Sequence, residues 1–480
     1  MKWEELLSSK RYGEYYYKND QDNIGQVSEK RITYQNSDLR SEFEKDYHRI
    51  IISASLRRLQ DKTQVFPLDK SDFIRTRLTH SLEVSSLAKS LGQNISSNIL
   101  KRIGDASFAL DMKDAVCDIL QCAGLIHDIG NPPFGHFGEE AIRNWFSLHL
   151  KDLSMPDGSR VLEHLTEAMQ GDFYHFEGNA QALRLVSKLH FLVNENGMNL
   201  TFGLLNTIIK YPGSSLEINP KSGNCKDKKM GYFQSEKELF EKIVGACNSR
   251  GKRHPLTFIL EAADDIAYRT ADIEDAYKKR CFNYDTLLKE LKLQVPDTYA
   301  VTVLEKQYEK AIKMNVDNPH LYAIQNWAVR LQGYFIYAAT DGFTANYKKI
   351  MEGSYGSDLF EGNVAKDILK ALGNIAYKYA FTSMPILKLE IAADTIISFL
   401  LDKLIPAAIC YDTNWKMGMM EEKLIRLISE NYIQIYHHYS KDKSEDEKLY
   451  LRLLLVTDYI SGMTDSFAKN LYQELNGISE

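Results

Sequence analysis

The sequence predicts an all-α fold made of one compact helical core and an additional C-terminal helical region. Apolar residues recur at helical spacing early in the chain, for example at Phe43, Tyr47, Ile50 and Ile51. From Cys281 onward the chain consists of successive amphipathic patterns, with no strand alternation and no internal repeat. A chain of 480 residues with 44% hydrophobic side chains can bury a large core. The expected divisions are an N-terminal arm at residues 1–39, the helical core at residues 40–282 and the C-terminal region at residues 283–480.

Charge and cysteine content narrow the class of protein. The formal net charge of -6 gives no overall argument for nucleic-acid binding, so such contacts would have to be local. The six cysteines form no CxxC pair, and Cys117 and Cys122 fall inside a predicted helix, which favours free thiols in a reducing compartment. The first residues lack the apolar segment of a signal peptide, and no apolar run reaches about 18 residues. We therefore expect a cytoplasmic protein without a membrane span.

The first 39 residues are polar and rich in tyrosine, without a clean period. We expect either an arm that packs on the body or on a neighbouring subunit, or a partly ordered terminus. The helical pattern begins at Arg40 and continues through Leu56. Gln64 follows a predicted turn, where a solvent-facing loop glutamine is the simplest interpretation.

The stretch Ala123–Glu140 carries the clearest chemical signal. An apolar helix ends there with His127 and Asp128 side by side, followed by a Gly-Asn-Pro-Pro turn that stops the helix. Imidazole and carboxylate groups are ligands for Mn, Fe, Mg, Co or Zn. A single His-Asp pair is weak evidence, however, because a chain with 12 histidines contains about one such pair by chance.

Two further residues make a metal site plausible on spacing. His80 begins a helix that enters the core, and Asp264 lies in a helical segment with Tyr268 and Asp272 at i+4 and i+8 on the same face. The metal ligands predicted from three helices are His80, His127, Asp128 and Asp264.

His136 and Glu139 are the candidate catalytic pair. They lie three residues apart at the start of the next predicted helix, so their side chains share one face. The carboxylate can fix the tautomer of the imidazole and raise its basicity, which suits proton transfer in either direction. The alternative is a histidine that only caps the turn after the two prolines.

Several charged residues have both a functional and an ordinary interpretation. Arg75 and Arg77 precede His80, and each can meet a phosphate or form a surface salt bridge. The Lys-rich loop Gly213–Gly231 is of a kind that is usually only solvated. We expect a solvated helix face for the acidic residues Asp265, Glu274 and Asp275, and a solvated loop for Lys441–Lys448.

Blocks along most of the chain resemble one known family, the bacterial deoxyguanosine triphosphate triphosphohydrolases within the HD-domain hydrolases. The segment GNPPFGHFGE after the His-Asp pair is the most specific of them. The other blocks are RSEFEKDYHRIIISASLRRLQDKTQVFPL, FIRTRLTHSLEVSSLA, FEGNAQALRL, EAADDIAYRTADIEDA and YISGMTDSFA. The resemblance implies one divalent metal ion per site, such as Mn, Mg, Co or Fe. It places the metal on the same four residues that spacing selects.

The resemblance also implies a set of substrate contacts. A lysine-tyrosine pair, Lys210 and Tyr211, and Lys229 before a Gly-aromatic step would bind the triphosphate, with Arg77 as a further phosphate contact. Glu177 and Asn179 would line the site, with His175 beside them, although Asn179 alone would be interpreted as a helix N-cap.

The sugar and base contacts follow from the same resemblance. Gln64 would contact the base or sugar, while Tyr268 and Asp272 would meet the 3′ hydroxyl and Tyr268 would exclude a 2′ hydroxyl. Glu390 and Arg452 would recognise guanine through its donor and acceptor edges. For the last two residues the alternatives are a helix-helix ion pair and a buried structural role.

The expected reaction is the hydrolysis of dGTP, or of dNTPs more generally, to the deoxynucleoside and inorganic tripolyphosphate. Two other functions compete with it: another HD-domain phosphohydrolase acting on a monophosphate, a cyclic nucleotide or a guanosine polyphosphate, and a non-catalytic helical protein that keeps the metal as a staple and binds nucleic acid. The resemblance further implies a homo-oligomer, a hexamer or tetramer, with a dNTP or single-stranded DNA as effector.

Overall fold

The all-α prediction is confirmed. The computed structural model describes residues 1–13, 38–66, 74–190 and 196–478, and within these ranges regular structure is helical, with only isolated bridges such as Arg11 with Thr201. Most of the expected N-terminal arm lies outside the described residues. No described helix is long and apolar enough to cross a membrane.

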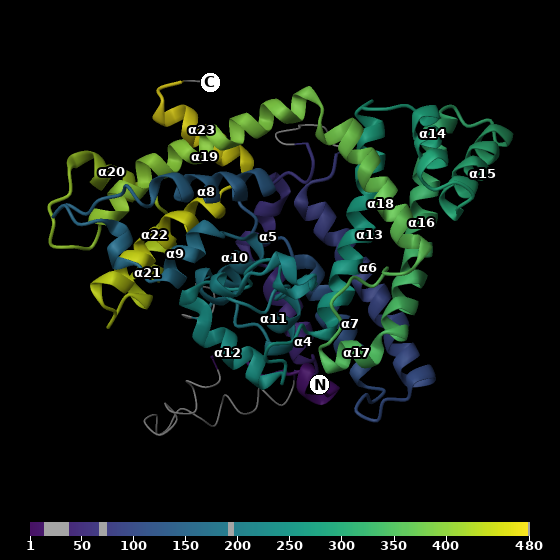
Figure 1. Ribbon diagram of the computed structural model, residues 1–480, viewed down its shortest axis with the longest axis horizontal. Helices are drawn as coiled ribbons and strands as arrows, with labels where there is room; N and C mark the ends of the chain where they lie inside the picture. The colour runs from purple at the N-terminus through teal and green to yellow at the C-terminus, as the bar shows by residue number, and fades with distance from the viewer. Residues whose placement is uncertain (14–37, 67–73, 191–195, 479–480) are drawn as a thin grey trace.

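The part of the chain that carries the predicted ligands folds as a cluster of helices at the centre of Figure 1. Its helices are α1 (Trp3–Leu6), α4 (Glu42–Ile51), α5 (Ala54–Arg58), α6 (Arg77–Asn98), α7 (Met112–Ile126), α8 (His136–His149), α9 (Glu167–Tyr174), α10 (Gly178–Arg184), α11 (Phe202–Ile208), α12 (Lys237–Ala246) and α13 (Pro255–Lys278).

The remaining helices surround this cluster on two sides (Figure 1). They are α14 (Tyr284–Gln294), α15 (Tyr299–Lys313), α16 (Pro319–Ala345), α17 (Tyr347–Glu352), α18 (Val364–Ala376), α19 (Met384–Cys410), α20 (Met419–Leu427), α21 (Glu430–Tyr439), α22 (Glu445–Ser461) and α23 (Asp465–Leu475). Helices α16 and α18 pack on α13. The long helix α19 packs on α8, α20, α22 and α23, and so connects the C-terminal helices to the central cluster.

Helices α6, α7 and α13 form the frame of the site. Each of α6 and α13 starts where the sequence provides a cap: the side chain of Thr76 accepts from the backbone N–H of Thr79, and the ring of His254 accepts from the N–H of Leu256 just after Pro255. Helices α6 and α7 cross closely at Gly124. The backbone of α6 lies so near that a Cβ added to Gly124 would be 2.5 Å from Cα of Ser85. Helix α13 also packs against both α6 and α7.

Two sequence-based expectations are wrong in detail. Glu274 and Asp275 do not form a solvated face: they lie 2.9 and 2.6 Å from guanidinium nitrogens of Arg75, and Asp275 is buried. The charged run Lys441–Lys448 is a loop only in its first half, because α22 begins at Glu445. The stretch Gly213–Gly231 is a loop, as expected, with short 3₁₀ turns. The pairing of Arg75 depends on packing between distant segments, whereas the start of α22 has a local signal, the capping box of Ser444 and Glu447.

Candidate active site

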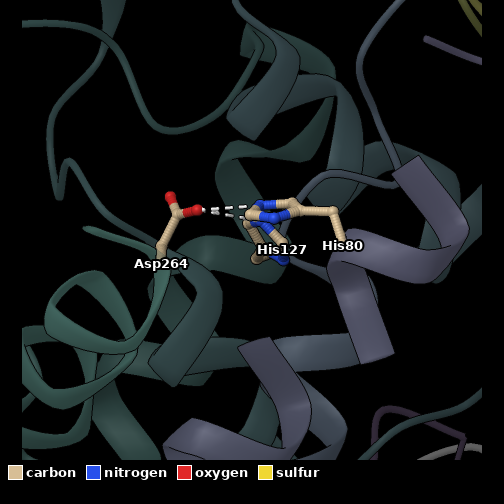
Figure 2. Close-up of side chains that lie close together, drawn as sticks. All are labelled: His80, His127 and Asp264. Atoms are coloured by element: carbon tan, nitrogen blue, oxygen red, sulfur yellow. Dashed lines mark hydrogen bonds and ion pairs between the residues drawn. The ribbon is translucent and has the colours of Figure 1, made fainter. Parts of the chain in front are cut away.

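Three of the predicted metal ligands meet where α6, α7 and α13 approach. His80 comes from the first turn of α6, His127 follows the last residue of α7, and Asp264 comes from the middle of α13. Oδ1 of Asp264 lies 3.1 Å from Nε2 of His80 and 3.4 Å from Nε2 of His127 (Figure 2). One donor atom from each residue lies within 4.8 Å of the other two, so the three residues form a group that can hold a metal ion.

The hydrogen bonding of His127 fits a metal ligand. Its Nδ1 lies 2.8 Å from the carbonyl oxygen of Gly124, so this nitrogen carries the proton and donates it to the backbone. Nε2 then carries a lone pair, and within the described part of the chain it is buried without a hydrogen-bond partner. A buried acceptor without a donor is costly, and a divalent cation would satisfy it.

Asp128 lies beside this group and forms an ion pair with Arg77. Its Oδ1 is 3.6 Å from Nε2 of His127, while Oδ2 accepts a hydrogen bond from Nη1 of Arg77. Asp128 is therefore near enough to be the fourth ligand after a small rotation, and that role stays a prediction.

The carboxylates of the group are held in their ionised form. Burial opposes the charge of Asp264, but the positive charge that His127 carries when it is protonated and the Lys210 ammonium, 3.5 Å away, keep the pKa of this carboxyl well below its usual range. Burial likewise opposes the charge of Asp128, and protonated His127 together with Arg77 outweighs it and lowers the pKa. Ionised carboxylates at neutral pH are the state that binds a cation.

His136 and Glu139 form the pair that their spacing predicts. Nδ1 of His136, the first residue of α8, lies 2.9 Å from Oε2 of Glu139. The hydrogen bond to Glu139 raises the pKa of His136, whose ring is exposed. Glu139 is buried, and its other oxygen accepts from the N–H of Gly178 at 2.7 Å, so the carboxylate is fixed from both sides. This arrangement leaves Nε2 of an oriented imidazole open for proton transfer.

A second acidic residue lies behind this pair. Oε2 of Glu177 is 2.7 Å from Nζ of Lys229, and its Oε1 accepts from the side-chain amide of Asn179 at 2.6 Å. Burial and the neighbouring Glu139 raise the pKa of Glu177, while Lys229 opposes them. The structure therefore brings Glu177, Asn179 and Lys229 together next to the His136 pair. The N-cap of α10 is Glu177, not Asn179.

Comparison with known proteins decides the family. The family model of the HD domain matches residues 77–194, the part that contains His80, His127 and His136. A deoxyguanosinetriphosphate triphosphohydrolase-like protein of Listeria innocua is 45% identical over the whole of both chains. The chain belongs to the deoxyguanosinetriphosphate triphosphohydrolase family of HD-domain proteins. A more distant member is a deoxyguanosinetriphosphate triphosphohydrolase of Serratia proteamaculans, which is 32% identical over 91% of this chain and 94% of its own. Another is a deoxyguanosinetriphosphate triphosphohydrolase-like protein of Synechocystis, which is 33% identical over both full chains. This confirms the predicted family and a metal-dependent nucleotide phosphohydrolase.

The residues that family resemblance assigns to phosphate and sugar lie partly around the metal group. Tyr268 and Asp272 continue the face of α13 that carries Asp264, and burial raises the pKa of Asp272 to about 8. Lys210 reaches Asp264 itself, and burial raises the pKa of the adjoining Tyr211. Oε1 of Gln64 is buried without a hydrogen-bond partner in the described part of the chain, so it is not the solvent-facing loop residue of the simplest interpretation.

The two predicted guanine contacts come from the C-terminal helices α19 and α22. Glu390 on α19 is half-buried and close enough to Glu140 on α8 for this neighbour, after burial, to raise its pKa. Arg452 on α22 is 1% exposed and lies near Tyr436 and Cys410. No contact in the described ranges connects Arg452 to the metal group. Its burial matches the alternative of a structural role.

Two other predicted positions, Arg75 and His175, have surroundings that fit a structural role. Arg75 contacts Glu83, Glu274 and Asp275, which saturates its guanidinium with carboxylates. His175 ends α9, and burial lowers its pKa. Neither has a contact to the metal group in the described residues, and Arg77, which pairs with Asp128, stays the predicted phosphate contact.

Sequence reasoning missed Lys62 and Asp465. Lys62 is 3% exposed, and burial lowers its pKa to about 7, although a lysine in a polar segment normally indicates the surface. Asp465 lies in the YISGMTDSFA block, which carries the family resemblance but no metal-ligand spacing. Its position in that block was the only signal that could have identified it.

Proposed function

We propose that the protein hydrolyses dGTP and related dNTPs to the deoxynucleoside and inorganic tripolyphosphate. The observation that carries the proposal is the group His80, His127 and Asp264 next to an oriented His136–Glu139 pair. The name of the Serratia proteamaculans relative, a deoxyguanosinetriphosphate triphosphohydrolase, supports the substrate. Family membership over the whole chain supports the transfer of that function.

The reaction follows from the roles of these residues. In the proposed step a water oxygen bonds to the α-phosphorus, the bond from phosphorus to the 5′ oxygen breaks, and that oxygen leaves as a hydroxyl with a proton. His80, His127 and Asp264, with Asp128 as a further ligand, would hold a divalent ion, which would supply Lewis-acid stabilisation and make water at the site more acidic. His136 exchanges the proton, and Glu139 keeps its ring oriented with Nε2 free.

The cations around the group suit a triphosphate. A nucleoside triphosphate carries about four negative charges, so the carboxylates of the site must be offset. Arg77, Lys210 and Lys229 supply positive charge beside Asp128, Asp264 and Glu177. Tyr211 adds a hydroxyl next to Lys210.

Selection of deoxyribose is proposed for the face of α13. Tyr268 and Asp272 follow Asp264 by one and two helical turns, so a sugar next to the α-phosphate meets them. A carboxyl with a pKa of about 8 is protonated at neutral pH. It can therefore donate a hydrogen bond to a hydroxyl as well as accept one from it. Gln64 supplies an amide toward the same nucleoside. Glu390 and Arg452 stay the guanine contacts in the proposal.

A product assay tests this function. Purified protein is incubated with Mn or Mg and with each of the four dNTPs and GTP, and nucleoside and tripolyphosphate are separated. Turnover of dGTP to deoxyguanosine and tripolyphosphate is expected, with GTP rejected. Monophosphate or pyrophosphate products would instead indicate another HD-domain phosphohydrolase, and salt-dependent DNA binding without turnover would indicate a non-catalytic protein.

Assembly and regulation complete the proposal. Met384, Leu387 and Ile391 lie on one face of α19 and are 64%, 38% and 69% exposed, which supports burial of this face in a homo-oligomer, a hexamer or tetramer. Light scattering of the wild type and of Ile391→Glu measures the subunit number, which should fall in the variant. A dNTP or single-stranded DNA effector would appear as a change in dGTP turnover on its addition.

A further inference from the structure

A buried lysine connects the turn after the metal ligands to the C-terminal part of the chain. Nζ of Lys62 donates hydrogen bonds to the carbonyl oxygens of Asn131 at 2.6 Å and of Ser461 at 2.7 Å. Asn131 lies between Asp128 and His136, and Ser461 is the last residue of α22. A buried ammonium is costly unless its donors are used, so this residue fixes the distance between the two segments.

Asp465 makes a second connection to the same turn. Its Oδ1 accepts from the N–H of Phe134 at 2.8 Å, and its Oδ2 accepts from the N–H and the hydroxyl of Thr63 at 2.9 and 2.5 Å. Asp465 is 1% exposed, so water does not compete for these bonds. The two carboxylate oxygens of Asp465 thus join Thr63, next to Gln64, to Phe134 in the turn before His136.

The backbone of this turn needs such support. Phe134 has φ of 63°, a conformation that costs energy for a bulky residue, and Gly135 follows with φ of 61°. His136 is the next residue and begins α8. Any relaxation of Phe134 would therefore rotate the start of α8 and with it the imidazole. Strained backbone persists only where neighbouring contacts hold it.

We propose that Lys62 and Asp465 are positioning residues that hold the Asn131–Gly135 turn, and through it His136, in the orientation that the reaction needs. They touch neither the metal group nor the proton-transfer atoms, and they act through the backbone of the turn. The C-terminal Ser461–Asp465 segment is in this sense part of the active site. The inference rests on the proposed function for its kinetic consequence, but not for its structural one.

The test compares Asp465→Asn with Asp61→Asn. Asp61 accepts a hydrogen bond from the hydroxyl of Ser466 at 2.9 Å, so the control breaks a bond between the same two segments without touching the turn. In Asp465→Asn one carboxylate oxygen becomes an NH₂ group that faces an N–H donor. We expect kcat for dGTP to fall on the order of 10- to 100-fold, with KM and metal content close to wild type, because a small misplacement costs that much. Asp61→Asn should keep both kcat and KM.

A measurement independent of activity accompanies the kinetics. Hydrogen exchange of the peptide that covers residues 129–137 should become faster in Asp465→Asn and stay unchanged in Asp61→Asn. Equal exchange in both variants, or a wild-type kcat in Asp465→Asn, would overturn the inference. If Asp465→Asn fails to fold, two other variants replace it: Thr63→Val, which removes only the hydroxyl bond, and Lys62→Met. Both are measured by dGTP kinetics and by hydrogen exchange of residues 129–137. A wild type that leaves dGTP intact refutes the proposed function, while the exchange data still decide whether the turn is held.

Discussion

At the scale of single residues, the proposed site separates metal binding from proton transfer. Nδ1 of His127 is used by the carbonyl of Gly124, so only Nε2 is available to a metal ion. Nδ1 of His136 is used by Glu139 and only its Nε2 is available to substrate. Each imidazole therefore has one task, fixed by the hydrogen bond on its other nitrogen.

This separation predicts different losses for two histidine variants. His80→Ala removes one of three metal donors, so we expect both bound metal and turnover to fall at least tenfold. His136→Ala should keep the metal content of the wild type while turnover falls about 10²- to 10⁴-fold. Metal analysis of dialysed protein and a dGTP assay distinguish them. Loss of metal from His136→Ala would place that residue among the ligands.

The His136–Glu139 pair also predicts a shift in the pH dependence of dGTP turnover. The hydrogen bond that His136 donates to Glu139 favours the charged form of His136 and raises its pKa, so Glu139→Gln should lower it. The limb of the kcat/KM profile that reports His136 should move to lower pH. A limb that rises with pH identifies a base, because the neutral ring is then active, and a limb that falls identifies an acid.

Glu140→Gln is the matched control for this experiment. Glu140 is the next residue of α8, is exposed and faces Glu390 instead of His136. Its profile should superimpose on that of the wild type. If Glu139→Gln also leaves the profile unmoved, His136 is not the titrating group of the reaction.

At the scale of helices, the ligand geometry depends on close approach. His127 lies three residues after Gly124, where α7 touches the backbone of α6. Gly124→Ala should therefore destabilise the protein by about 1–3 kcal/mol through overpacking and weaken metal binding. Gly333 in α16 has no atom within 4 Å of an added Cβ, so Gly333→Ala should be neutral or stabilising by about 0.5–1 kcal/mol. Thermal unfolding and metal titration measure both effects, and equal destabilisation of the two variants would contradict the close crossing.

The packing of helices also explains which features of the fold and the site could be predicted from the sequence. The starts of α8 and α13 and the shared face of Asp264 and Asp272 follow from local spacing and proline placement, which one segment encodes by itself. The pairing of Arg75 with Glu274 and Asp275 depends on α6 packing against α13, and a single segment carries no trace of it. Lys62 was missed for the same reason. The roles assigned to Glu390 and Arg452 rest on family resemblance and stay predictions.

At the scale of the whole molecule, Asp172 joins α9 to the C-terminal helix α22. Its Oδ2 accepts from the hydroxyl of Tyr450 at 2.5 Å and from the N–H of Gln234 at 2.6 Å, and Oδ1 lies 3.0 Å from the hydroxyl of Ser215. Burial raises the pKa of Asp172 from 3.8 to about 7. The folded protein thus keeps a proton that the unfolded chain loses between these two values. This contribution to stability is fully present below about pH 4 and is lost as the pH rises through about 7.

Asp172→Asn removes this titration. The amide resembles the protonated acid, so the stability of the variant relative to the wild type should increase from pH 5 to pH 8, by at most about 1.4 kcal/mol per pH unit. Urea unfolding at the two pH values measures the difference. Asp157→Asn, at a fully exposed position, is the control and should show no such increase. A difference that is constant with pH would show that Asp172 is ionised throughout.

The contact between Phe134 and Asp465 spans 331 residues, and this separation has a consequence for the nascent chain. A ribosome that adds about 5–20 residues per second delivers Asp465 roughly 15 to 65 s after Phe134. His80, His127 and Asp264 all leave the ribosome well before that moment. On the proposed roles of these residues, the nascent chain can bind its metal ion before it contains the segment that positions His136.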